Sequence, residues 1–157
     1  MQPLDLVLRW AHILPAMALL GGALFMRLAL HPAAETLPAE QAATLKGAAR
    51  ARWRHVVRLS ILLLLISGLT NFVLTVQRYE VEKPLYHMVF GIKFLLALGI
   101  FFLAEMLNGR SELAEKFRAR SAFWLNVLLA LAITLVCLSG VLKLSPHTPK
   151  AAATTTR

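Results

Sequence analysis

Four long apolar segments constrain the fold of this chain more than any other feature. Each approaches or exceeds the roughly 20 helical residues that span about 30 Å of hydrocarbon in a bilayer. A segment inside a membrane must also satisfy its own backbone hydrogen bonds, which an α-helix does. The sequence therefore predicts an all-α protein, an integral membrane four-helix bundle with up-down topology. The four segments run from Leu4 to Leu30, Leu59 to Val76, Met88 to Leu107 and Ala122 to Leu142.

Composition agrees with one transmembrane domain. The hydrophobic share of the chain, 58% of 157 residues, exceeds the roughly 45–50% that is typical of soluble domains. We predict a transmembrane domain over residues 1–143 and a disordered polar tail over residues 144–157, which is rich in proline and small polar residues. The first segment is too long for a signal peptide and opens with Asp5 rather than a basic cluster, so we expect it to stay uncleaved. The predicted spans cover residues 4–31, 55–77, 86–108 and 121–143.

The connections between the segments carry their own signals. The first connection is rich in Ala, Glu, Gln, Lys and Arg, which favours a second helix that begins outside the hydrocarbon. In the third connection, Asn108-Gly109 is a stop signal, and a short amphipathic stretch follows it before the fourth segment.

Charge predicts how the chain is oriented. A net charge of +9 would suggest nucleic acid in a soluble protein, but here most basic residues fall in the connections, so we expect no nucleic-acid partner. The positive-inside rule then predicts a multi-pass protein of the inner (plasma) membrane with both termini outside. Anionic membrane lipids are the expected partners of the basic surface. The other side holds five basic residues, whereas the first and third connections hold nine: Lys46, Arg50, Arg52, Arg54, Arg58, Arg110, Lys116, Arg118 and Arg120.

Ionisable side chains inside the apolar segments need a partner or a function, because each costs a few kcal/mol or more in a membrane. His12 lies well inside the half of the membrane nearer to the termini, and Arg27 follows fifteen residues later on nearly the same helix face. His87 and Glu105, eighteen residues apart, share one face of the third segment. We predict that His12 and His87 lie in the outer half of the membrane and that Arg27 and Glu105 lie in the inner half.

Histidines from two helices predict a haem or metal site with His12 and His87 as metal ligands. Imidazole nitrogens ligate iron, and Gly91 leaves room for a flat ring. A basic side chain would then neutralise a haem propionate. Lys93 is the least expected candidate, because it lies about nine residues into its helix at a depth similar to that of His12. The four candidates are Arg27, Arg54, Arg58 and Lys93.

A second pair of candidate cofactor-binding residues, His31 and His55, lies at the inner membrane surface. Histidines beside arginines at a membrane boundary are more often solvated or bound to lipid. We therefore favour that interpretation for this pair over ligation of a cofactor. Cys137 is expected to be a buried free thiol. Small and polar residues of the second and fourth segments are expected to mediate helix packing; they are Ser60, Ser67, Asn71, Asn126, Cys137 and Gly140.

Three stretches of the chain resemble a known superfamily. They are AHILPAMALLGGALFMRLALHPA, YHMVFGIKFLLALGIFFLAEML and FRARSAFWLNVLLALAITLVCLSGVLK, and they are similar to helices of the HemJ-type protoporphyrinogen oxidases and CopD-like copper-resistance domains. The resemblance implies a four-helix haem or metal scaffold. It also implies that His12 matches a helix-1 histidine proposed as a haem ligand, Arg27 the family's arginine and Lys93 its helix-3 lysine. The GGALF segment looks more like CopD.

Three hypotheses about function follow. The first is a membrane b-type haem protein for electron transfer or HemJ-like porphyrin oxidation, an oxidoreductase served by a redox partner. The second is copper handling of the CopD kind, with the histidines and the thioethers of Met17, Met26 and Met88 as ligands. The third is a cofactor-free accessory or lipid-binding subunit whose histidines form hydrogen bonds between helices. A homodimer is an expected assembly for so small a bundle.

Overall fold

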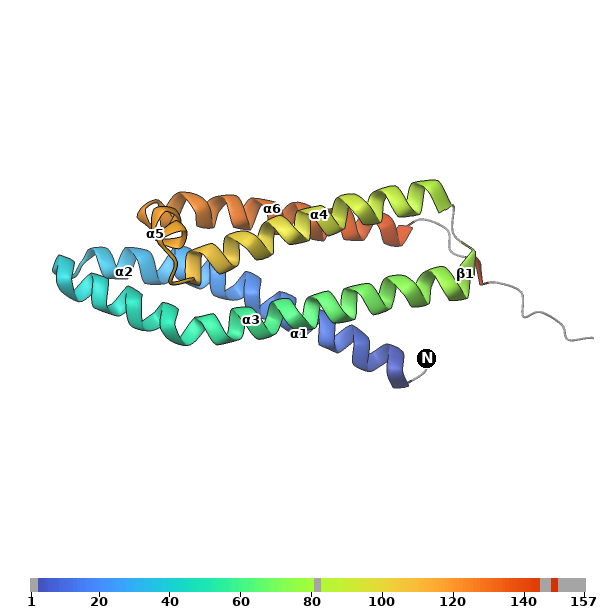
Figure 1. Ribbon diagram of the computed structural model, residues 1–157, viewed down its shortest axis with the longest axis horizontal. Coiled ribbons are helices and arrows are strands. Elements are labelled where there is room, and N and C mark those ends of the chain that lie inside the picture. Colours follow the sequence, from blue (N-terminus) through green and yellow to red (C-terminus); the bar gives the residue numbers. More distant parts are fainter. Residues whose placement is uncertain (1–2, 81–82, 145–147, 150–157) are drawn as a thin grey trace, which may run out of the picture.

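The computed structural model describes residues 3–80, 83–144 and 148–149. Within these ranges four long helices form an up-down bundle, in which two helical hairpins lie along each other (Figure 1). All four are long and apolar enough to cross a membrane. The predicted all-α membrane bundle is therefore confirmed.

The first spanning unit is helical without interruption from Pro3 to Glu35. It comprises α1 (Pro3–Phe25), the π-helical segment η1 (Met26–Leu30) and α2 (His31–Glu35). The His31 N–H donates to the Met26 carbonyl, five residues earlier. Pro32 has no N–H to offer the preceding turn, and a wider turn is one way to satisfy the carbonyls that a proline leaves without a donor.

The remaining elements complete the two hairpins. As predicted, the second long helix begins well before its apolar segment and a short helix precedes the fourth. Of the predicted tail, Leu144 is the last residue of α6, and Thr148 and Pro149 are the other described residues. The elements are α3 (Ala39–Arg78), α4 (Lys83–Asn108), α5 (Glu112–Ala119) and α6 (Ser121–Leu144), with the strand β1 (Tyr79–Glu80) pairing antiparallel with β2 (Thr148–Pro149).

Large apolar side chains cover the outside of the bundle, as lipid contact requires. Five of them are more than 60% exposed: Leu14, Met17, Leu28, Leu95 and Val136. Cys137 is also exposed, so the prediction of a buried thiol is wrong. The reason is that Cys137 follows Val136 on a part of α6 that faces outward, and in a membrane an apolar thiol needs no burial inside protein.

Packing is uneven along the bundle. We call the end that holds α2, α5 and the first turns of α3 the basic end, and the end that holds the start of α1 and β1 the terminal end (Figure 1). Beyond the level of Ile100 toward the terminal end, the buried residues are Pro15, Leu64 and Ser67, among those whose burial the structure describes. The core therefore lies toward the basic end, where one cluster comprises Ala23, Val57, Ile100, Leu103, Ala104, Leu107, Leu125, Leu128 and Leu129.

A close contact between α1 and α3 begins that core. The Trp53 indole lies directly against the backbone of Gly22, so that a methyl group on Gly22 would overlap the indole ring. The neighbouring Gly21 has open space around it. Of this glycine pair, only Gly22 is therefore required by close approach.

Candidate functional site

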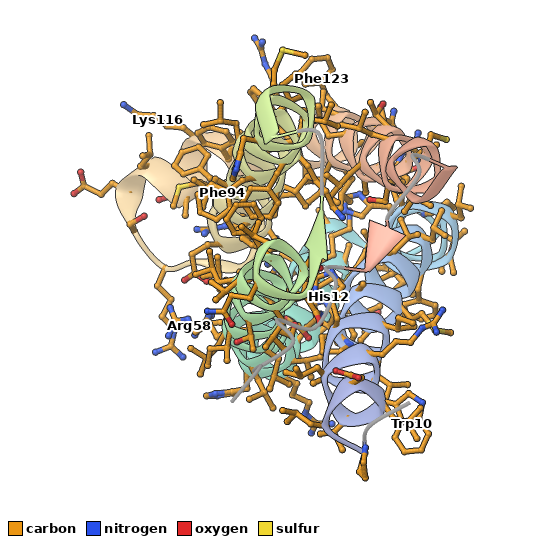
Figure 2. The ribbon with its side chains drawn as sticks, turned by 90° about the vertical axis from the view of Figure 1, so that its right-hand side faces the viewer. Trp10, His12, Arg58, Phe94, Lys116 and Phe123 are labelled. Carbon is orange, nitrogen blue, oxygen red and sulfur yellow. The ribbon has the colours of Figure 1, made fainter. Side chains whose placement is uncertain are left out.

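His12 forms a hydrogen bond between helices in the looser half of the bundle. Its Nδ1 atom lies 2.9 Å from the Ser67 hydroxyl oxygen on α3. The imidazole is half-buried, whereas Ser67 is only 1% exposed. Figure 2 places His12 against the neighbouring helix, while Trp10 points away from the bundle. The histidine that the sequence singled out is therefore an inward-facing residue.

The hydrogen-bond network assigns the protonation of the ring. The Ser67 hydroxyl donates its one hydrogen to the Leu63 carbonyl, at 2.6 Å. It must then accept from His12, so Nδ1 carries a hydrogen. In the neutral imidazole the other ring nitrogen, Nε2, is left with a lone pair. A metal-ligating histidine has this arrangement, with one nitrogen held by a hydrogen bond and the other available to the ligand.

Gly68 lies beside the His12 ring on α3. A Cβ atom at Gly68 would be 3.5 Å from Cε1 of His12, in van der Waals contact. The Ser67-Gly68 pair thus provides both an acceptor for the ring and a flat backbone surface beside it. The sequence analysis assigned Ser67 to helix packing only; its place in the membrane opposite His12 was not evident from the spacing.

Lys93 is the second unusual side chain near His12. Contacts between α3 and α4, which include Arg54 with Asn108 and Phe72 with Phe90, set an antiparallel register that places Lys93 about opposite Leu69. Leu69 is two residues from Ser67, the partner of His12. The Lys93 ammonium lies within electrostatic range of the His12 imidazole. The similar depth predicted for His12 and Lys93 agrees with this register.

The charge of Lys93 has no counterpart in the described part of the chain. Lys93 is half-buried and forms no ion pair or hydrogen bond with another described residue. A cation inside a span is expected to have a partner. An anionic group of a bound molecule would supply one.

His87 lies away from His12. It is exposed at the start of α4, and its ring contacts Phe72 edge-on, with centroids 5.6 Å apart and an interplanar angle of 72°. By the same register it is level with Thr75, eight residues or about 12 Å along α3 from Ser67. The structure thus brings Lys93, and not His87, to the depth of His12.

Arg27 and Glu105 lie toward the basic end, as predicted, but each has a partner of its own. Arg27 Nε donates to Asn126 Oδ1 at 2.8 Å and so connects η1 to α6. Glu105 forms an ion pair with Arg58, at 2.6 Å between Oε1 and Nη2. Arg54 Nε donates to the carbonyl of Asn108 at 2.8 Å. These arginines, named as candidate partners of a propionate, hold the bundle together far from His12.

The two histidines of the second pair have different surroundings. His31 lies within electrostatic range of Lys46, Arg27, Glu35 and Arg50 and lines a small cavity of about 40 Å³. His55 is exposed on α3 and lines neither this cavity nor the larger one beside it.

Two of the thioethers named for copper face outward. Met17 and Met88 are 64% and 57% exposed, on the outside of the bundle. Among the residues that the structure describes, no three His, Cys, Asp or Glu side chains gather where they could hold a metal ion. The groups that the site around His12 offers to a ligand are therefore the Nε2 atom of His12 and the ammonium of Lys93.

Comparison of the chain with protein-family models, with curated proteins and with solved structures finds no match.

Proposed function

We propose that the protein is a membrane-embedded b-type haem protein with His12 as an axial ligand to the iron, serving electron transfer. The observation that carries the proposal is the Ser67 hydrogen bond, which holds Nδ1–H of His12 and leaves Nε2 with its lone pair. The donor chemistry of this residue fits haem, since a neutral imidazole nitrogen is a common axial ligand.

Lys93 supports the same assignment. A haem carries two propionates, and a half-buried ammonium without an anionic partner among the described residues suits one of them. Alternatively, the amine of Lys93 would be a second ligand of the iron. The looser packing of this half of the bundle, with few buried residues, is compatible with a bound ring.

When bound, haem would supply reversible one-electron chemistry. The residues of the chain have simpler tasks. Ser67 fixes the orientation of the imidazole, Gly68 lies beside the ring, and the apolar side chains of the spans limit the access of water. The polarity of the ligands and the exclusion of water then set the redox potential.

An absorption spectrum tests the proposal. The full chain is produced with ample haem supply and purified in detergent, and a Soret band that shifts on reduction with dithionite is expected. His12→Ala should abolish the band, and His87→Ala, as the matched histidine variant, should retain it. Helical content by circular dichroism and a single size-exclusion peak show that each variant has folded. A colourless wild-type protein, or a Soret band that survives His12→Ala, would overturn the assignment.

One alternative has an observation in its favour. The hydrogen bond from His12 to Ser67 joins two helices without any cofactor, as in an accessory or lipid-binding subunit. In that case the protein stays colourless and His12→Ala lowers only its thermal stability.

We further propose that the basic end faces the cytoplasm of a cell whose plasma membrane the protein spans. The support is the excess of Lys and Arg in the connections at that end.

A further inference from the structure

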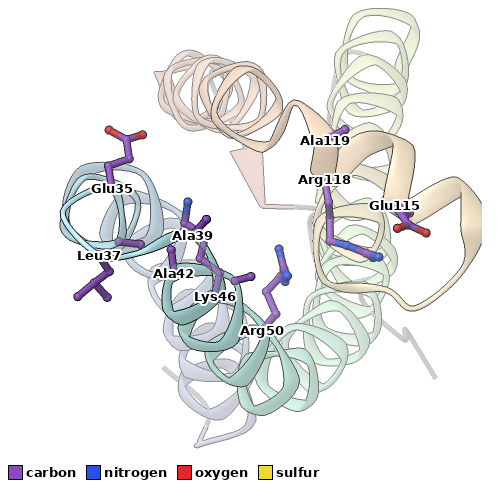
Figure 3. Close-up of a pocket in the computed structure, with 11 residues that line it drawn as sticks. Glu35, Leu37, Ala39, Ala42, Lys46, Arg50, Glu115, Arg118 and Ala119 are labelled. Carbon is purple, nitrogen blue, oxygen red and sulfur yellow. The ribbon is translucent and has the colours of Figure 1, made fainter.

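A cavity of about 690 Å³ lies at the basic end, outside the site around His12. Lys46 and Arg50 project toward it from α3, and Arg118 belongs to α5 on the other side (Figure 3). Two carboxylates, Glu35 and Glu115, also line it. Most of the remaining wall is made of alanine, which leaves room beside the cations: Ala34, Ala39, Ala42, Ala43 and Ala119.

The cations of this cavity form no ion pair with another described residue. Lys46 and Arg50 form no ion pair or side-chain hydrogen bond with another described residue. Arg118 donates to the carbonyl of Gly109 at 2.5 Å, but a carbonyl carries no net charge. Arg50 and Arg118 are near enough to repel each other. Three cationic residues therefore line one space, and the two carboxylates pair with none of them in the described part of the chain.

Positive charge continues beyond the main cavity. Lys46 and Arg50 also line the adjoining space of about 40 Å³, together with His31. Arg27 lies within electrostatic range of His31 as well. The region is therefore electropositive from the cavity up to the beginning of the bundle core.

The part of the cavity that Arg50 lines lies at the depth of the headgroup layer of a membrane, and Lys46 lies farther out. Arg54 bonds to Asn108, the last residue of α4, and so marks where that span ends. At 1.5 Å per residue, Arg50 lies about 6 Å and Lys46 about 12 Å beyond this level. The headgroup region of each leaflet extends roughly 5–8 Å outside the hydrocarbon.

We propose that this cavity binds a phosphate group, that of an anionic phospholipid whose acyl chains lie along the bundle. Arg50 and Arg118 offer guanidinium groups suited to phosphate oxygens, and Lys46 adds a point charge. The alanine wall, which lies farther from the hydrocarbon, leaves room for the rest of the headgroup beside the cations. The site holds a lipid between the α1–α3 hairpin and α5, and it is independent of any haem.

Native mass spectrometry of the full chain in neutral detergent tests the site. The protein is titrated with phosphatidylglycerol, with zwitterionic phosphatidylcholine, and with inorganic phosphate and glycerol 3-phosphate. Phosphatidylglycerol is expected to bind and phosphatidylcholine to bind more weakly. Arg50→Gln and Lys46→Gln should each weaken phosphatidylglycerol binding about fivefold. Arg50→Lys, which keeps the charge, should retain most of the binding.

Two charge-matched variants are the controls. Arg52→Gln on α3 and Lys116→Gln on α5 remove exposed cations that do not line the cavity, and binding should stay within twofold of wild type. Equal losses in these controls would mean diffuse surface attraction and would overturn the proposal. Phosphate or glycerol 3-phosphate could instead bind tightly, with the same losses in Arg50→Gln and Lys46→Gln. That result would support a phosphate site but contradict the proposal that the phosphate belongs to a lipid. If Arg50→Gln does not fold, Lys46→Gln beside Lys116→Gln decides the question alone.

Discussion

A hydrogen bond of 2.9 Å joins His12 on α1 to Ser67 on α3, and the Ser67 hydroxyl donates a second hydrogen bond to the Leu63 carbonyl at 2.6 Å. The two bonds together fix which nitrogen of the imidazole is protonated. They make Ser67 a positioning residue for His12, with consequences for both stability and ligand binding.

Replacing Ser67 should separate these two roles. Ser67→Ala removes the acceptor of His12 Nδ1–H, and the thermal unfolding of the protein should show a loss of about 0.5–1.5 kcal/mol. In the haem-loaded protein the variant should keep a Soret band, but the midpoint potential of the haem should shift. The reason is that the hydrogen bond from Nδ1–H to Ser67 no longer orients the imidazole. Ser60→Ala, another buried serine on α3, is the control. An unchanged midpoint potential in Ser67→Ala would contradict the positioning role of Ser67.

Lys93 should oppose the stability of the bundle when no ligand is present. Lys93→Met removes a charge that has no partner among the described residues, so the cofactor-free protein should become more stable by about 1–3 kcal/mol. The same variant should weaken haem retention. Denaturation in detergent and haem titration measure the two effects, with Lys116→Met on exposed α5 as control. A destabilised apoprotein would mean that Lys93 has a structural partner after all.

The glycine pair of α1 allows a matched packing test. Gly22→Ala should cost about 1–3 kcal/mol because its methyl group overlaps Trp53, whereas Gly21→Ala, which meets nothing, should be neutral or stabilising. The double variant Gly22→Ala with Trp53→Leu should recover part of the loss. Thermal melts of the four proteins measure these differences. If the two single variants behaved alike, the close approach of α1 and α3 at this point would be contradicted.

Orientation in the membrane is testable with two positions on one helix. Ala48 and Gln77 are exposed on α3 and lie about 43 Å apart along its axis, enough to place them on opposite sides of a bilayer. On a Cys137→Ser background, a membrane-impermeant thiol reagent added to whole cells should label Gln77→Cys and spare Ala48→Cys until the cells are opened. The reverse pattern would put the basic end outside.

The sequence contained the information for the architecture because the bilayer imposes strict requirements on a chain. Runs such as Met88 to Leu107 have few folds open to them in hydrocarbon, so composition and length were enough to predict four helices and their order. The depth of an isolated side chain follows from counting along its helix, which is why Arg27 and Glu105 were placed in the correct half. Their partners could not be derived in this way, since Arg27 bonds Asn126 and Glu105 pairs with Arg58.

What the tertiary structure decided is which side chains meet. The sequence by itself determined that His12 and Lys93 are costly residues inside a membrane. It did not determine that the register of α3 brings Ser67-Gly68 to the histidine, that His87 lies elsewhere, or that Lys46, Arg50 and Arg118 surround one cavity. Helix periodicity specifies the face of a residue on its own helix, whereas contacts between helices depend on rotation and axial offset, which are set by close packing such as Gly22 against Trp53.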